Sequence, residues 1–253
     1  MRNYNTLFVG KVLHHFEQIP STNEYAIKLI AKSKPSEGTV ISSHSQTAGK
    51  GQFGRQWESP PGLNLYLSLI LYPSFLAANR QFLLSQAMAL AVSDAIKACI
   101  PSQNIDLKWP NDIYINQHKT AGILIQNTLS GPHIQSSIIG IGLNINQTEF
   151  PARLPNPTSL ALIAGHSLEL ADVQASLFQS IESRYLSLRA NHIDQIESDY
   201  LAQLLDYGVD RYYTRQDGQT FIGRITGLDK NGKLAITHAG GTEYFAMGEV
   251  RRV

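Results

Sequence analysis

The residues best suited to chemistry lie in a glycine-rich segment, 46–57, and in a second short segment, 108–112. The first reads Gln-Thr-Ala-Gly-Lys-Gly-Gln-Phe-Gly-Arg-Gln-Trp, and the second reads Lys-Trp-Pro-Asn-Asp. Glycines let backbone N–H groups approach phosphate oxygens, cations offset their charge, and an indole offers a face on which a base can stack. The two segments therefore predict a site for an anionic, nucleotide-like ligand.

Two common phosphate-binding motifs do not account for the glycine-rich segment. Residues 49–54 match G-x-G-x-x-G by letters, but a dinucleotide fingerprint must open a helix, and here prolines and a predicted strand follow. A Walker A loop needs glycine where this chain has His44, and Ser or Thr where it has Gly51. Taken alone, the segment is better explained as a mobile hairpin loop that carries incidental charges, and only the other segments of the chain favour a ligand site.

Hydrophobic periodicity and turn residues predict the elements that would position these segments. Ser21 and Glu24 form a capping box, so a helix should begin at Thr22. The glycine-rich segment should join two strands. The expected strands are 39–43, 63–71, 105–109, 113–115, 121–128 and 134–145. The other expected helices are a core helix over 79–98, one capped by Asp172, and one over about 192–205.

The last part of the chain has a different sequence pattern, with short strands and closely spaced turns. Asp217-Gly218, Asn231-Gly232 and Gly240-Gly241 separate short strands, and such dipeptides favour tight hairpins. We therefore expect an α+β protein in which a mixed β-sheet domain packed with helices, residues 1–207, precedes a small all-β barrel, residues 208–253.

Composition narrows the classes of function. Lysine plus arginine (21) nearly balances aspartate plus glutamate (20), so no global positive field favours DNA binding. The single cysteine excludes an internal disulfide framework, and the histidines show no zinc-site spacing. No apolar stretch looks long enough to span a bilayer, and no signal peptide is recognisable. These features predict a cytoplasmic protein that binds neither DNA nor a membrane.

Four segments, in order, resemble those of the biotin protein ligases. They accompany the glycine-rich segment and are Ser21-Thr22-Asn23, the segment 108–112, the segment from Lys119 to Gln126, and the segment from Gly140 to Asn146. The similarity runs over 21–146 and resumes over 227–250, which looks like the SH3-like barrel of that family. Single motifs of this kind are weak, whereas the ordered set is specific.

The resemblance implies a two-step reaction. Biotin and MgATP would give biotinyl-5′-adenylate and pyrophosphate, and a lysine of a biotin carboxyl carrier protein would then attack the mixed anhydride. Lys119 would be the principal catalytic residue, in contact with the biotin carboxylate and the α-phosphate. Lys50 and Arg55 would assist it, because cations offset the repulsion between two anions.

The resemblance also implies two sets of binding residues. Those expected for biotin are Ser21, Thr22, Asn23, Gln46, Lys50, Gly51, Gln52, Lys119, Gly122 and Leu124. Those expected for ATP are Gly49, Arg55, Trp57, Lys108, Asn111, Asp112 and Asn144. Mg²⁺ would arrive with ATP, and Asp112 would either help to position it or orient a neighbouring lysine. Ser21 would serve as a helix cap, a ligand contact, or both.

This chain departs from the usual family pattern in several places. Lys50 and Gln52 stand where arginines are common. A lysine cannot give the bidentate fork of an arginine, and Gln52 carries no charge, so retention of the adenylate should be looser. Gln126 stands where glutamate is common. The residues before Ser21 are too few for a helix-turn-helix domain, so we expect no repressor function.

Two alternatives to biotin ligation, and the oligomeric state, stay open. One alternative is a lipoate or octanoate ligase or transferase on the same architecture. The other is a non-catalytic biotin- or nucleotide-binding module, in which Lys119 would be dispensable for turnover. A homodimer is compatible with the sequence.

Overall fold

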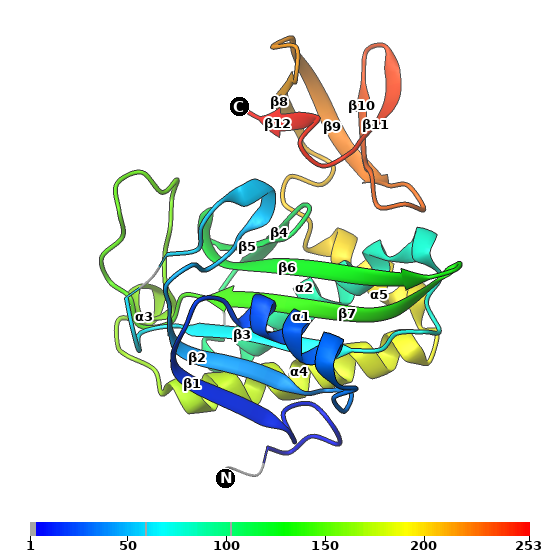
Figure 1. Cartoon of the computed structure of the whole chain (residues 1–253). Helices are drawn as coiled ribbons and strands as arrows, with labels where there is room; N and C mark the ends of the chain where they lie inside the picture. The colour runs from blue at the N-terminus through cyan, green and yellow to red at the C-terminus, as the bar shows by residue number, and fades with distance from the viewer. Residues whose placement is uncertain (1–3, 59, 102) are drawn as a thin grey trace.

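The protein is built on one large β-sheet, and a smaller sheet sits above it (Figure 1). The computed structural model describes residues 4–58, 60–101 and 103–253. The large sheet has seven strands in the order β1-β2-β3-β7-β6-β5-β4. β1 and β2 are parallel, and the other neighbouring pairs are antiparallel. The α+β fold class expected from the sequence is confirmed.

The strands of the large sheet are β1 (Leu13–Ile19), β2 (Val40–Gln46), β3 (Leu65–Leu71), β4 (Ile105–Lys108), β5 (Asp112–Ile115), β6 (His118–Ser130) and β7 (His133–Leu143). The helices are α1 (Thr22–Lys32), α2 (Phe82–Cys99), α3 (Leu160–Ala164), α4 (Leu170–Arg189) and α5 (Ile193–Ala202), with 3-10 turns at Gln52–Gly54 and Ala78–Arg80. The small sheet contains β8 (Asp210–Arg215), β9 (Thr220–Leu228), β10 (Leu234–His238), β11 (Gly241–Phe245) and β12 (Val250–Arg252).

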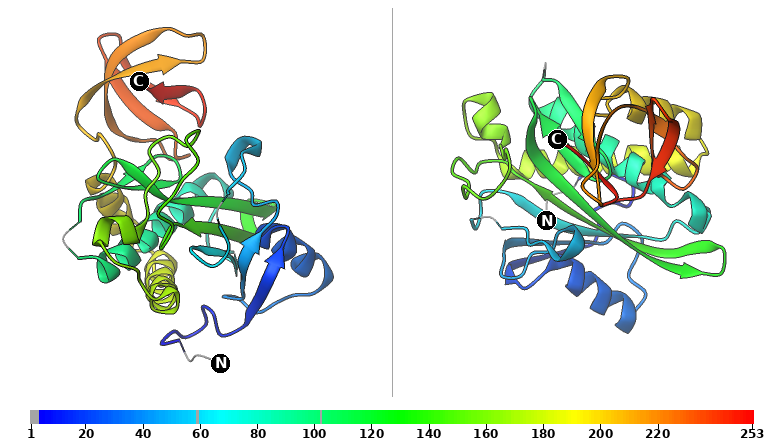
Figure 2. Two further views of the ribbon diagram at one scale, coloured as in Figure 1. Left: turned by 90° about the vertical axis from the view of Figure 1, so that its left-hand side faces the viewer. Right: turned by 90° about the horizontal axis from the view of Figure 1, so that it is seen from above.

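Helices cover both faces of the large sheet (Figures 1 and 2). α1 packs on one face, against β2, β3 and β7, and α2 packs on the other with α4 and α5 behind it. Every residue of β3 is buried because this central strand is covered on both sides. The core position that the sequence predicts for the helix over 79–98 is confirmed in α2, most of whose residues are buried.

One membrane expectation needs correction. The stretch Ala78–Cys99 is long and apolar enough, by length and composition alone, to cross a bilayer. Of its apolar window, 67% is buried inside the protein, as in the core helix of a water-soluble domain.

Burial also raises the pKa of the half-buried Cys99 thiol at the end of this helix, which disfavours the reactive thiolate.

Most predicted helix and strand positions are confirmed, with two errors at helix ends. α1 begins at Thr22, and the Ser21 side chain accepts from the Glu24 backbone N–H at 3.5 Å. Asp172 does not cap α4: the N-cap is Glu169, and Asp172 lies in the first turn, where a negative charge suits the helix dipole. α5 ends at Ala202 rather than near 205.

Two elements were not expected at all. The strand β1 is rich in polar and half-exposed residues because it lies at the edge of the sheet, so it lacks the apolar alternation of an ordinary strand. The five-residue helix α3 is too short to give a helical period.

The small sheet has the hairpins that its turn residues predict. Its strands follow the order β11-β10-β9-β8-β12. Gly218, Gly232 and Gly241 adopt positive φ angles of 85°, 83° and 116° at the turns. Buried residues of this sheet, including Ile225 and Leu234, belong to the same hydrophobic core cluster as the helices of the large sheet. The boundary at 207/208 stays a prediction.

Candidate active site

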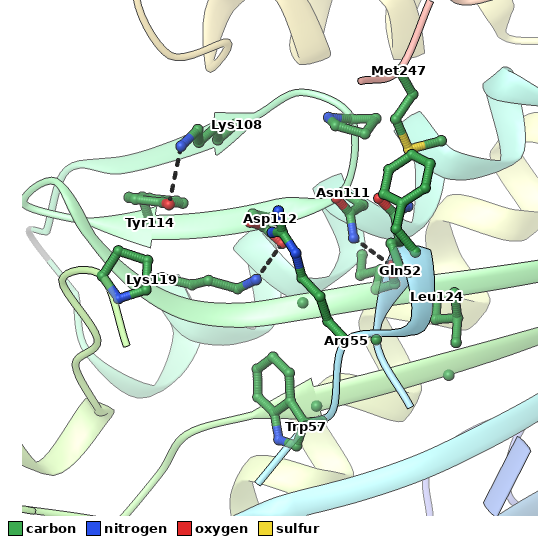
Figure 3. A pocket seen from close by; sticks show the side chains of 18 of the residues that line it. Gln52, Arg55, Trp57, Lys108, Asn111, Asp112, Tyr114, Lys119, Leu124 and Met247 are labelled. Atoms are coloured by element: carbon green, nitrogen blue, oxygen red, sulfur yellow. Dashed lines mark hydrogen bonds and ion pairs between the residues drawn. The ribbon is translucent and has the colours of Figure 1, made fainter. Parts of the chain in front are cut away.

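A cavity of about 600 Å³ lies on the α1 side of the large sheet and reaches the small sheet. It is lined by almost all residues that the sequence singled out, and Figure 3 shows many of them facing one another. These lining residues are Ser21, Thr22, Asn23, Gln46, Lys50, Gly51, Gln52, Arg55, Trp57, Lys108, Asn111, Asp112, Lys119, Gly122, Leu124 and Asn144. Gly49 lies instead in a smaller neighbouring hollow that shares Gln46 and Trp57 with the cavity.

Three glycines of β6 and β7 form a bare floor. A Cβ atom added at Gly140 would lie 2.3 Å from Asn23 Oδ1, and one at Gly142 would lie 2.5 Å from the Trp57 ring. A Cβ at Gly122, which pairs with Gly142, would lie 2.9 Å from the same ring. These glycines are thus required because other side chains approach the strands closely.

One end of the cavity is polar and neutral. It is formed by the first turn of α1 and the end of β2. Gln46 Oε1 accepts from the Thr22 backbone N–H at 2.8 Å and from the Thr22 hydroxyl at 3.2 Å. Asn23 Nδ2 donates to Gln126 Oε1 at 3.1 Å. Because all of these partners are uncharged, this end suits a neutral polar group rather than an ion.

The other end is cationic. Lys119 Nζ lies 2.6 Å from Asp112 Oδ1 and 5.6 Å from the centre of the Trp57 ring. Lys108 Nζ donates to the Tyr114 hydroxyl at 3.3 Å. Figure 3 shows Lys119, Asp112 and Lys108 on the side of the cavity opposite Leu124. In this view Arg55 is drawn between these three side chains and Leu124. An anionic ligand group would be stabilised here.

Two residues of this end have specific polar properties. The pKa of Tyr114 is raised, chiefly by burial and also by the nearby Asp112 charge, so its hydroxyl stays protonated at neutral pH. The buried indole Nε1 of Trp57 has no hydrogen-bond partner among the described residues. The indole can therefore offer both a ring face and a hydrogen-bond donor to a ligand.

The glycine-rich loop forms a short irregular hairpin beside the cavity. The Gly51 N–H donates to Arg55 O at 2.7 Å, and the Trp57 N–H donates to Gly49 O at 3.0 Å. Lys50 Nζ lies 2.6 Å from Glu24 on α1. Phe53 adopts a positive φ of 53° and is 71% exposed. At the tip of the loop, Phe53 lies near Gly248 of the small-sheet region, where an added Cβ atom would be 3.6 Å from Phe53 Cζ.

Other predicted residues have structural partners. Asn111 Nδ2 donates to Ile123 O at 2.8 Å, and Asn144 Nδ2 donates to Thr158 O at 3.0 Å. These amides hold the strand ends around the cavity and leave their Oδ1 atoms for other contacts. Trp109 packs against the hydrophobic core and also lines the cavity, and its Nε1 donates to Gly232 O at 2.9 Å.

Sequence reasoning missed part of the lining. Tyr114 alternates with the apolar residues of β5, so it looked like an ordinary strand residue. The small sheet and its turns contribute Tyr213, Met247, Arg251 and Arg252. Only the packing of the two sheets brings these four into the site, and no local motif marks them.

The comparisons with known proteins agree with this arrangement. The sequence model of the "Biotin/lipoate A/B protein ligase family" matches residues 15–144. A biotin–[acetyl-CoA-carboxylase] ligase of Paracoccus denitrificans is 32% identical over 241 residues, which are 91% of this chain and 96% of that protein. The bifunctional ligase/repressor BirA of Bacillus subtilis is 33% identical over 234 residues, which are 91% of this chain and 71% of that protein.

Among solved structures, the biotin protein ligase from Aquifex aeolicus in complex with biotin and ATP superimposes with a TM-score of 0.79. It shares 27% sequence identity, and the match covers 96% of this chain and 100% of that one.

Proposed function

The chain belongs to the biotin/lipoate A/B protein ligase family, and from this membership we propose that it is a biotin protein ligase. It activates biotin with ATP to biotinyl-5′-adenylate and transfers the biotinyl group to a lysine of a carrier protein. The observation that carries this function is the division of one cavity into a neutral polar end and a cationic end. Biotin has a neutral urea head and an anionic carboxylate tail, so it matches this division.

In the first step, a carboxylate oxygen of biotin attacks the α-phosphorus of ATP. A new O–P bond forms, and the bond to the pyrophosphate oxygen breaks. Both reactants are anionic, so cations must offset their repulsion. We assign this role to Lys119, with Lys50 and Arg55 from the loop. Asp112, 2.6 Å from Lys119, orients the ammonium group.

In the second step, the uncharged amine of the carrier lysine attacks the carbonyl carbon of the adenylate. The C–N bond forms, the C–O bond to AMP breaks, and the amine loses a proton. Water must be kept from the adenylate between the steps. The glycine-rich loop, residues 49–57, serves as the cover, and Trp57 lies against the adenine base.

The remaining ligand and partner assignments are proposals. Among the described residues 4–58, 60–101 and 103–253, no group of three or more His, Cys, Asp or Glu side chains could hold a metal. The ion pair of Asp112 with Lys119 favours its orienting role, so Mg²⁺ enters as part of MgATP. The partner is a biotin carboxyl carrier protein domain in the cytoplasm, without DNA or a membrane. A homodimer stays a prediction.

Incorporation of labelled biotin into a purified carrier domain tests this function. The reaction is run with MgATP, without ATP, and with lipoate in place of biotin. We expect labelling by biotin alone, and only with ATP. Preference for lipoate would assign the sister activity, and tight biotin binding without transfer would indicate a binding module.

A further inference from the structure

A buried serine lies directly behind the neutral end of the cavity. Ser68, in the middle of β3, has no exposed surface and does not itself line the cavity. Its Oγ lies 2.8 Å from Thr22 Oγ1 and 2.5 Å from Asn23 Oδ1. Thr22 and Asn23 are themselves buried, and both reach the cavity. Ser68 is thus the hydroxyl that joins these two side chains.

A count of protons and lone pairs shows what this network leaves for a ligand. The Thr22 hydroxyl donates its proton to Gln46 Oε1, so the Ser68 hydroxyl is the donor that faces both Thr22 Oγ1 and Asn23 Oδ1. Asn23 therefore turns its Oδ1 toward Ser68, and its Nδ2 gives one hydrogen to Gln126 Oε1 at 3.1 Å. One Asn23 N–H and one Thr22 lone pair remain without a partner in this network.

The two remaining groups match the head of biotin. A urea has a carbonyl acceptor and N–H donors, so it can accept from Asn23 and donate to Thr22. Asn23 lies over Gly140, whereas Trp57 lies over Gly142, two residues farther along the same face of β7. Two residues of a strand span roughly 6.6 Å. The neutral head and the anionic tail would thus lie along one strand face.

We propose that Ser68 is a positioning residue for the urea head of biotin, which it orients through Thr22 and Asn23. This inference rests on the proposed function. Gln126 completes the arrangement from the other side, because its Oε1 accepts from Asn23 as a carboxylate oxygen at that position would. Without Ser68, Asn23 Oδ1 loses its buried donor, and the side chain is free to turn.

Steady-state kinetics of Ser68→Ala test the proposal. We expect the KM for biotin to rise about tenfold, as for a buried polar group left unsatisfied. The kcat at saturating biotin and the KM for ATP should stay within about twofold, because only binding of the head is weakened. Ser68→Cys keeps the shape of the side chain with a weaker donor, so its KM for biotin should lie between those of the wild type and Ser68→Ala. It provides a second variant if Ser68→Ala does not fold.

Ser137→Ala is the matched control. Ser137 is an equally buried serine of the same sheet, on β7, and it donates to Asn127 Oδ1 at 2.7 Å outside the cavity. Its removal should lower the melting temperature without changing the KM for biotin. A biotin analogue with a protonated imino group in place of the urea carbonyl gives a further readout. Ser68→Ala should narrow the ratio of KM values between this analogue and biotin.

The outcomes separate the two proposals. If the wild-type protein does not transfer biotin, the proposed function fails. If the wild type is active and both Ser68 variants keep its KM for biotin, the positioning role is overturned. A parallel rise of both KM values, with an unchanged analogue ratio, would also overturn it by indicating general damage to the fold.

Discussion

At the scale of residues, the site depends on a few cations at one end of a cavity whose other end is polar and neutral. Lys119 is the clearest case, because it faces the cavity, contacts Asp112, and lies near the Trp57 ring. A Cβ atom added at Gly122 would lie 3.5 Å from Lys119 Nζ, so this glycine leaves room beside the ammonium group. The roles of individual site residues are predictions, and two substitutions test them most directly.

Lys119→Ala should lower the rate of adenylate formation by about 10²–10³-fold, the usual cost of removing one preorganised donor from a transition state. Pyrophosphate release in a single turnover measures this step. Lys97→Ala, a change of an exposed lysine on α2, should leave the rate unchanged. Full activity of Lys119→Ala would exclude the catalytic assignment and favour a role in binding alone.

Gln52→Arg should lengthen the lifetime of the bound adenylate. Arginine offers charge-assisted hydrogen bonds to the ligand that Gln52 cannot make, and a contact of this type at a partly exposed position supports a change of about fivefold. Release of labelled adenylate from the preformed complex is the measurement. Gln18→Arg adds the same charge on β1, outside the cavity, and should have no effect. An unchanged lifetime in Gln52→Arg would show that loop charge does not control retention.

At the scale of elements, the glycine-rich loop is the part most able to change. It carries an exposed Phe53, and its Lys50 contact with Glu24 is between two partly exposed groups. Such ion pairs contribute only about 0–1 kcal/mol. The loop can therefore open and close at low cost.

Trypsin should cleave the empty protein after Lys50 or Arg55, and biotin with ATP should slow this cleavage. A ligand that orders the loop lowers the population of the open form that the protease attacks. Lys230, in the exposed turn between β9 and β10, provides an internal control whose cleavage should not respond to ligand. Equal cleavage of the loop with and without ligand would argue against its role as a cover.

The small sheet contains a titratable cluster that links its stability to pH. Arg215, and secondarily His238, hold the pKa of Glu243 at about 2, below its ordinary value of 4.5. Arg215 also lies 4.4 Å from the centre of the Phe221 ring. Because the folded-state pKa is lowered, the stabilisation is complete above about 4.5 and is lost as the pH falls through about 2.

Glu243→Gln should therefore lower the melting temperature at pH 7, and the difference from wild type should shrink between pH 4.5 and pH 2. Thermal unfolding followed by circular dichroism over this range measures it. Glu197→Gln removes an exposed pair with Arg80, 3.9 Å apart, and should change little at any pH. A difference that stays constant down to pH 2 would contradict the linkage.

At the scale of the whole molecule, the two sheets are joined more closely than the change in sequence texture suggests. Trp109 donates to Gly232 O, and Asp206 pairs with Arg211 and with Arg252, each at 2.8 Å. The Asp206 side chain is only 6% exposed, so these charges are partly shielded from water. Together they fasten the small sheet beside the cavity.

The protein should consequently unfold in a single thermal transition. The shared core cluster extends from the helices that cover the large sheet to Tyr213, Ile236 and Phe245 of the small sheet. Unfolding of either part would therefore expose buried apolar surface of the other. Calorimetry should give equal calorimetric and van't Hoff enthalpies. Two separated transitions would show that the small sheet is an independent unit. Asp206→Asn weakens the ion pairs and leaves the shared core intact. It should therefore lower the melting temperature while the protein still unfolds in one transition.

The sequence by itself determined the local features of this protein. The capping box at Ser21, the glycine turns of the small sheet and the hydrophobic period of α2 all depend on near neighbours, so they are visible in a single chain. The cavity residues could be named because ordered motifs resemble those of a known family. Asp172 was misplaced because several residues of the same stretch can begin a helix, and context selects among them.

Only the tertiary structure decided which of these residues meet. Ser68 looks like an ordinary polar residue in a leucine-rich strand, and its role emerges only because α1 packs on β3 and sets Thr22 and Asn23 beside it. Met247 and Arg252 reach the cavity because the small sheet docks there. These contacts depend on the packing of segments that are far apart in sequence. Local sequence patterns therefore do not predict them.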